Sequence, residues 1–146
     1  MKQYYAVIDT NVIVSALISS LKNKASAPAQ ILGFALNTTI IPIYNEEIIH
    51  EYKDVLSRKK FGFPKETVDI LINAIITLGI YSDKIIADAV CNDPKDVVFY
   101  EVTLSVSGAY LITGNIKDFP LKPFIVTPAK MLDIILTTNQ IKNERG

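Results

Sequence analysis

The chain has 146 residues, with fifteen Lys or Arg and fifteen Asp or Glu residues, so its formal net charge is zero. Hydrophobic residues make up 49% of it, which is enough apolar surface for a core and excludes a disordered chain. One cysteine and one histidine exclude an internal disulfide and a Cys/His zinc site. We expect a single domain over residues 1–146, cytoplasmic and without a membrane anchor, because no apolar run is long enough to cross a bilayer.

The first 43 residues predict two strands with helices between them. A continuous apolar run at Tyr4–Asp9 predicts a central strand buried on both faces. Helical spacing follows from Thr10 to Leu17 and again from Pro28 to Leu36. Residues 38–43 predict a second strand. Because Pro42 has no backbone N–H, we expect the far end of this strand to be exposed or bent.

Two helices follow the second predicted strand. Asn45 is placed to cap the first, whose apolar stripe ends near Arg58. Pro64 opens the second, and Gly79 ends it.

The last third of the chain begins with an ambiguous segment at 83–90, which holds at most a short strand about 85–87. Strands that alternate with helices imply parallel crossovers, so we expect an α/β fold with a parallel sheet covered on both faces. The remaining predicted elements are a helix from Asp93 to about Ser107, strands at 110–113 and 124–126, and a helix from Pro128 onward.

Polar residues follow the predicted strands at the edge where ligands bind in parallel sheets. Asp9 and Asn11 come directly after the first strand, and Asn115 follows the strand at 110–113. Asp93 and Asp96 open a helix, and they reach the same edge only if the ambiguous segment before them leaves a strand there.

Glu51 is the acid of its helix that lies closest to the apolar stripe, ahead of Glu47 and Asp54. Arg58 lies two turns further on along the same side and would be a structural partner for it. The helical geometry therefore leaves two roles open for Glu51, one in a site and one in an ion pair.

Several carboxylates at one sheet edge would repel one another and raise their pKa values unless a cation neutralised them. Carboxylate oxygens suit Mg²⁺ or Mn²⁺. Such ions stabilise the attacking and leaving oxygens in phosphodiester displacement, and this chemistry needs no net positive charge on the protein.

Four segments of the sequence form a recognisable set: VIDTNV at 7–12, EIIHEYKDVLSR at 47–58, DPKD at 93–96 and TGNIKDFP at 113–120. Together they resemble the PIN-domain family of metal-dependent ribonucleases, in the family's order and spacing. The resemblance is to the small bacterial and archaeal toxin components of toxin–antitoxin pairs. It implies a three-layer α/β/α sandwich with a central parallel sheet, Mg²⁺ or Mn²⁺ at clustered acids, and cleavage of RNA.

By this resemblance Asp9, Glu51 and Asp96 are the first three catalytic and metal-binding acids of the family. The fourth acid falls at Asn115, which carries no charge, so a second ion would require Asp118 as its ligand. We therefore expect one tightly held ion and a weaker second one.

Thr10 and Asn11 are expected to support the metal-binding acids by hydrogen bonding, and Thr113 and Asn115 are expected to belong to the cofactor-binding site with them. Each acid also has a purely structural interpretation. Asp9 would cap the helix that starts at Thr10, and Asp93 is expected mainly to cap its own helix.

Two charged groups have structural interpretations that come first. Glu101 is expected to face the interior in an ion pair, with a role as an auxiliary acid second. The cluster Arg58-Lys59-Lys60, with Lys53 and Lys65 nearby, indicates a solvated helix end before it indicates a phosphate-binding patch.

The expected partners are an RNA substrate, a cognate antitoxin and a second copy of the chain, the last because residues 71–78 are rich in apolar side chains. The main alternative is a PIN domain that binds RNA or a protein without cleavage, favoured by Asn115 and the neutral charge. A phosphatase of the haloacid dehalogenase type would need an acid where the chain has Asn11. A receiver domain is disfavoured because no second acid accompanies Asp9 and the usual lysine is missing after Thr113.

Overall fold

The computed structural model of the chain describes residues 2–87, 91 and 93–145. Its sheet has five strands in the order β3-β2-β1-β4-β5, and each neighbouring pair is parallel. This confirms the predicted α/β fold. The strands are β1 (Tyr4–Ile8), β2 (Ile40–Tyr44), β3 (Ile80–Tyr81), β4 (Tyr110–Ile112) and β5 (Ile125–Val126).

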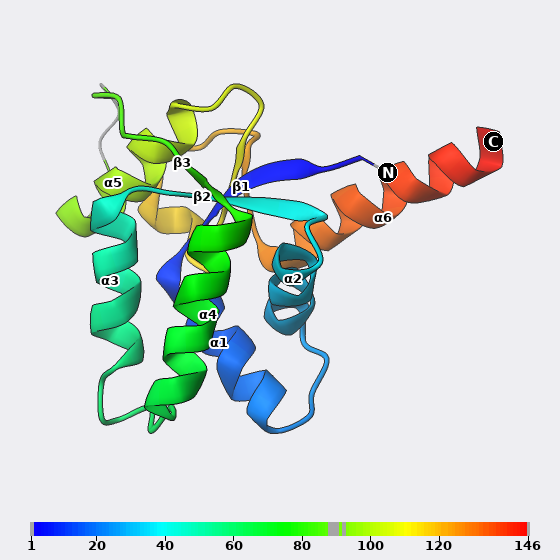
Figure 1. Ribbon diagram of the computed structural model, residues 1–146. Coiled ribbons are helices and arrows are strands. Elements are labelled where there is room, and N and C mark those ends of the chain that lie inside the picture. Colours follow the sequence, from blue (N-terminus) through cyan, green and yellow to red (C-terminus); the bar gives the residue numbers. More distant parts are fainter. Residues whose placement is uncertain (1, 88–90, 92, 146) are drawn as a thin grey trace.

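The helices connect the strands as crossovers (Figure 1). The chain moves outward from β1 to β2 to β3 and then returns to β4, on the other side of β1. Because parallel crossovers are right-handed, this reversal places the helix before β4 on the sheet face opposite to the earlier helices. The helices are α1 (Thr10–Leu21), α2 (Ala27–Leu36), α3 (Glu46–Leu56), α4 (Lys65–Leu78), α5 (Pro94–Leu104), η1 (Ile116–Asp118) and α6 (Pro128–Arg145).

The strand order reverses between β1 and β4, so their carboxyl ends are neighbours at the centre of the sheet. Ile8 aligns with Ile112, and the backbone N–H of Asp9 donates to the carbonyl oxygen of Ile112 at 2.9 Å. In open parallel sheets this reversal is where ligands bind.

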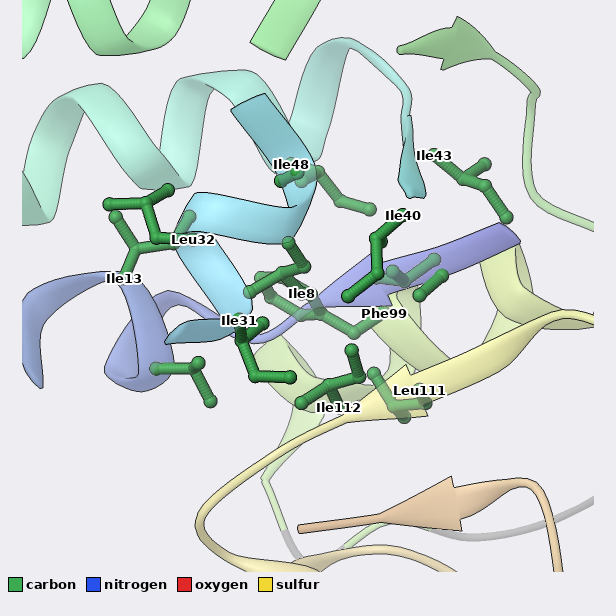
Figure 2. Packing of buried hydrophobic residues seen from close by; sticks show 14 of the residues in the cluster. Ile8, Ile13, Ile31, Leu32, Ile40, Ile43, Ile48, Phe99, Leu111 and Ile112 are labelled. Carbon is green, nitrogen blue, oxygen red and sulfur yellow. The ribbon is translucent and has the colours of Figure 1, made fainter. Parts of the chain in front are cut away.

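Buried apolar side chains from the strands and the helices pack together to form the core (Figure 2). Ile8 of β1 is 2% exposed, and Ile40 of β2 and Ile48 of α3 are fully buried. Each such side chain contributes about 1.5–3 kcal/mol by leaving water. Since Ile8 precedes Asp9, the core fixes the backbone from which that acid projects.

Two of the predicted helix caps, Asn45 and Asp93, are confirmed. The Asn45 side chain accepts from the N–H of Ile48 at 2.9 Å, and the Asp93 side chain accepts from the N–H of Lys95 at 2.9 Å. A cap of this kind is worth about 1 kcal/mol. Asp93 therefore has the structural role expected for it.

No helix in the described part of the chain is long and apolar enough to span a membrane.

The third strand differs from the prediction. It lies at Ile80–Tyr81 and pairs with Ile43 and Tyr44, whereas residues 85–87 form no strand. A two-residue strand that follows a helix directly gives no alternating pattern to detect. Residues 88–90 of the ambiguous segment lie outside the described residues.

Element ends also shift by a few residues. The first helix continues to Leu21, and α5 ends at Leu104, before Ser107. The second strand begins at Ile40, because Thr38 has a φ of 68° in the left-handed region, where a strand residue does not lie.

Pro42 lies buried in the middle of β2, so the expectation of an exposed or bent strand end is wrong. It is opposite Ala6 of β1, while β3 pairs only with the residues after it, so no strand needs the N–H that proline lacks. Gly79 ends α4 at this point. A Cβ on Gly79 would overlap the carbonyl oxygens of Pro42 and Ile75, so only glycine lets the helix end this close to the strand.

Candidate active site

Asp9 and Thr113 join the carboxyl ends of the two central strands. The Thr113 hydroxyl donates to Oδ2 of Asp9 at 2.7 Å, and the N–H of Asn115 donates to the same hydroxyl oxygen at 3.0 Å. Asp9 is 6% exposed and Thr113 is fully buried. The carboxylate is therefore held in one orientation by a residue 104 positions away in the sequence.

Burial raises the pKa of Asp9, and the negative charge of Asp118 adds to this rise. Hydrogen bonds from the Thr113 hydroxyl and from the backbone N–H groups of Asn11 and Thr10 oppose this rise by lowering the pKa of Asp9. Asp9 occupies the N-cap position of α1, but its side chain makes no capping hydrogen bond. The structural interpretation of Asp9 as only a helix cap does not account for the hydrogen bond that its carboxylate accepts from Thr113.

Asp96 lies in the first turn of α5 and is half-buried. Burial and the negative charges of Asp9, Asp93, Asp118 and Glu51, in that order, raise its pKa to about 6. The other three acids predicted for the site thus each act on Asp96. The fold brings acids from a strand end, two helices and the segment after β4 into one negative field.

Tyr52 positions the helix that carries Glu51. Its buried hydroxyl donates to the carbonyl oxygen of Ile8, the residue before Asp9. Burial raises the pKa of Tyr52, as does the charge of Asp9, so this hydroxyl keeps its proton and serves as a donor. One signal in the sequence could have indicated this role, a tyrosine inside the apolar stripe beside Glu51.

Glu51 is half-buried and lines a hollow of about 560 Å³ between the start of α3 and the start of α5. Arg58, the structural partner that the spacing suggested, instead contacts Asp54, with 3.3 Å between guanidinium and carboxylate. Pro94 and Lys95 form the α5 side of the hollow. This opening is large enough to admit part of a substrate beside Glu51.

The carboxylates share a field without forming a compact ligand set. Among the described residues, no three Asp, Glu, His or Cys side chains are close enough together to hold a metal ion. The donor chemistry nevertheless fits Mg²⁺ or Mn²⁺, since all four groups are carboxylates and three of them, Asp9, Glu51 and Asp118, raise the pKa of Asp96. The hydroxyl oxygen of Thr10 is buried and has no hydrogen-bond partner among the residues that the structure describes, which leaves one further oxygen beside Asp9.

Three polar residues predicted for the site lie at its margin. Asn11 and Asn115 are exposed, and Asn115 contributes its backbone N–H to Thr113. Asp118 is half-buried in η1 and acts on both Asp9 and Asp96 through its charge.

Glu101 faces the interior as expected, but its partner in the described part of the chain is not a cation. Its carboxylate accepts from the N–H of Ala87 at 2.7 Å. Lys84, in the same segment, pairs with Glu47 of α3 at 2.8 Å. These two contacts tie the segment after β3 to α5 and α3, a role that the sequence pattern did not indicate.

The chain matches the family model described as PIN domain over residues 5–117. The match covers well over half of the 146 residues, so the chain belongs to the PIN domain family. PIN domains are generally nucleases and typically use divalent metal ions. Comparison with curated proteins and with solved structures gave no significant match. The matched region contains Asp9, Glu51 and Asp96 and ends one residue before Asp118.

Proposed function

We propose that the protein is an endoribonuclease that hydrolyses RNA phosphodiester bonds with Mg²⁺ or Mn²⁺. The observation that supports this most directly is the raised pKa of Asp96, which reflects burial and the charges of Asp9, Asp93, Asp118 and Glu51 around it. Such repulsion is costly for a fold that has no use for it, and a bound cation would relieve it.

Asp9, Glu51 and Asp96 are the residues that would hold the ion, with Asp118 in place of the uncharged Asn115 for a weaker second one. A bound ion would supply positive charge to the phosphate and Lewis-acid activation of water. Thr113 would keep Asp9 ionised and correctly oriented, because its hydroxyl donates to that carboxylate.

The proposal is tested by incubating single-stranded RNA with the protein and Mg²⁺ or Mn²⁺, with EDTA as the metal-free control. We expect Asp9→Asn to lower the cleavage rate by about 10³-fold, which corresponds to several kcal/mol of lost transition-state stabilisation. Glu66→Gln, which changes an exposed acid on α4, is the matched control and should cleave normally. Equal rates for the wild type and Asp9→Asn would rule out this site.

The second candidate function is a PIN domain that binds RNA or a protein without cleavage. Two observations favour it: Asn115 replaces the fourth acid, and the described acids form no compact metal-binding group. It predicts RNA binding without cleavage in any divalent ion and no rise in melting temperature on addition of Mn²⁺.

We further propose that the protein is the toxin of a toxin–antitoxin pair, acts in the cytoplasm and forms a homodimer. In the predicted apolar run on α4, Leu71, Ile72 and Ile75 belong to the core, but Ile76 is 38% exposed, and Ile70, just before the run, is 70% exposed, so both are available to a partner. Expression of the wild type should stop growth, and Asp9→Asn should not. Co-expression of a small neighbouring reading frame should restore growth.

A further inference from the structure

The loop between α3 and α4 concentrates positive charge in a chain whose net charge is zero. Residues 57–65, which we name the basic loop, contain four cations and no acid. The residues at the cationic positions, Arg58, Lys59, Lys60 and Lys65, are all exposed. The loop lies at the end of α3 farthest from β2 (Figure 1).

Two phenylalanine rings stack on each other within the basic loop. The centroids of Phe61 and Phe63 are 5.5 Å apart, their planes differ by 11°, and both residues are half-buried. The ammonium group of Lys60 lies 5.0 Å from the centroid of the Phe61 ring. A turn shapes the loop. Gly62 has a φ of 63°, and the N–H of Phe61 donates to the backbone carbonyl oxygen of Arg58 at 3.1 Å.

The basic loop is connected to the proposed catalytic acids by α3 itself. Arg58 follows Glu51 by seven residues, which is two helical turns or about 10 Å along the axis. Asp54 lies between them, and its contact with Arg58 at 3.3 Å offsets its charge. A strand that enters at Glu51 and runs along α3 therefore reaches the cations and rings of the loop.

We propose that the basic loop binds the single-stranded part of the RNA beside the bond that is cleaved. Lys59 and Lys60 contact phosphates, and the Phe63 ring stacks on a base. Cations beside an aromatic face are the combination used by proteins that bind single strands, because phosphates take the charge and every base has a stacking face. The helix dipole accounts for cations at the end of α3, and Phe61 and Phe63 also pack against the core, but both rings keep part of their surface exposed beside the cations. The inference rests on the proposed ribonuclease function.

The test measures the dissociation constant of the Asp9→Asn protein, which should not cleave, for RNA of about 4 and about 16 nucleotides, sizes that bracket known single-strand sites. Phe63→Leu retains apolar packing and removes the aromatic face. We expect it to weaken binding of the longer RNA about tenfold and to leave the shorter one unchanged. Lys59→Ala with Lys60→Ala should reduce the slope of log affinity against log salt by about 1.4.

The matched controls change exposed groups elsewhere: Lys22→Ala with Lys24→Ala for the cations, and Tyr81→Leu for the ring. Melting temperatures identify any variant that has lost its fold. The proposal would be overturned if the loop variants bound RNA normally, or if the control variants lost as much RNA affinity as the loop variants did. It would also be overturned if the protein with an unsubstituted loop bound no RNA, or if the loop variants lost binding to a protein partner and kept their RNA affinity. Loop-dependent binding by a protein that never cleaves RNA would support the basic loop and refute the ribonuclease function.

Discussion

The acidic edge of the sheet has two halves that differ in how firmly their carboxylates are held. In the strand half, Asp9 is fixed by the Thr113 hydroxyl across β1 and β4. In the helix half, Glu51 and Asp96 make no side-chain hydrogen bond within the described part of the chain. One half is set by the sheet, and the other is free to adjust to an ion or a substrate. Preorganisation of a site can thus be confined to the residues nearest the core.

The largest change is expected from removal of the bond that fixes the strand half. Thr113→Val keeps the shape of the side chain but leaves Asp9 and the N–H of Asn115 without the hydroxyl. We expect RNA cleavage to fall about 10- to 100-fold, as for other residues that orient metal ligands. The free energy of unfolding should fall by about 1–3 kcal/mol. Thr103→Val removes a buried hydroxyl from α5 and should lose stability without a comparable loss of cleavage. Full cleavage by Thr113→Val would mean that the two halves are equally adjustable.

The helix half is tested by the pH dependence of stability. Since the pKa of Asp96 is raised to about 6 in the folded protein, folding favours its neutral form. The contribution of the neutral Asp96 carboxyl to the free energy of unfolding is fully present below about pH 4 and is lost as the pH rises through about 6. In EDTA, the melting temperature of Asp96→Asn relative to the wild type should therefore be a few degrees higher at pH 7 than at pH 4. Mn²⁺ should stabilise the wild type at pH 7 more than it stabilises Asp96→Asn. A difference between the two proteins that does not vary with pH would contradict the repulsion assigned to Asp96.

The smallest effect is expected at Asn115, which lies at the margin between the two halves. Asn115→Asp adds a carboxylate at an exposed position, where water screens much of its charge. We expect Mn²⁺ to bind a few times more tightly, measured by titration calorimetry. Asp133→Asn, an exposed change on α6, is the control for a general effect of net charge. Unchanged affinity in Asn115→Asp would remove this position from the site.

Features that depend on nearby residues were predictable from the sequence. The caps at Asn45 and Asp93 each join residues two or three positions apart, so the sequence alone contains both partners. The central strand was predictable because a short, continuous apolar run rich in β-forming residues is typical of a strand buried on both faces. Asp9 and Asp96 were singled out by their place after a strand and at a helix start, Glu51 by its place beside an apolar stripe, and the family resemblance named all three as site acids.

Features that depend on strand order were not predictable. Thr113 was expected near the site, but its bond to Asp9 requires β4 to lie beside β1, which no local pattern specifies. The hydrogen bond from Tyr52 to Ile8 joins residues 44 positions apart, so no local pattern predicts it either. Arg58 had two acids within reach on its helix, and the spacing could not tell which one it would contact.

Gly79 shows how a position with no side chain governs the edge of the sheet. Its hydrogen allows α4 to stop against Pro42, and β3 starts at the next residue. A methyl group there would push the helix end away from the Pro42 carbonyl, so the pairing of β3 with Ile43 and Tyr44 depends on a residue that contributes no contact of its own side chain.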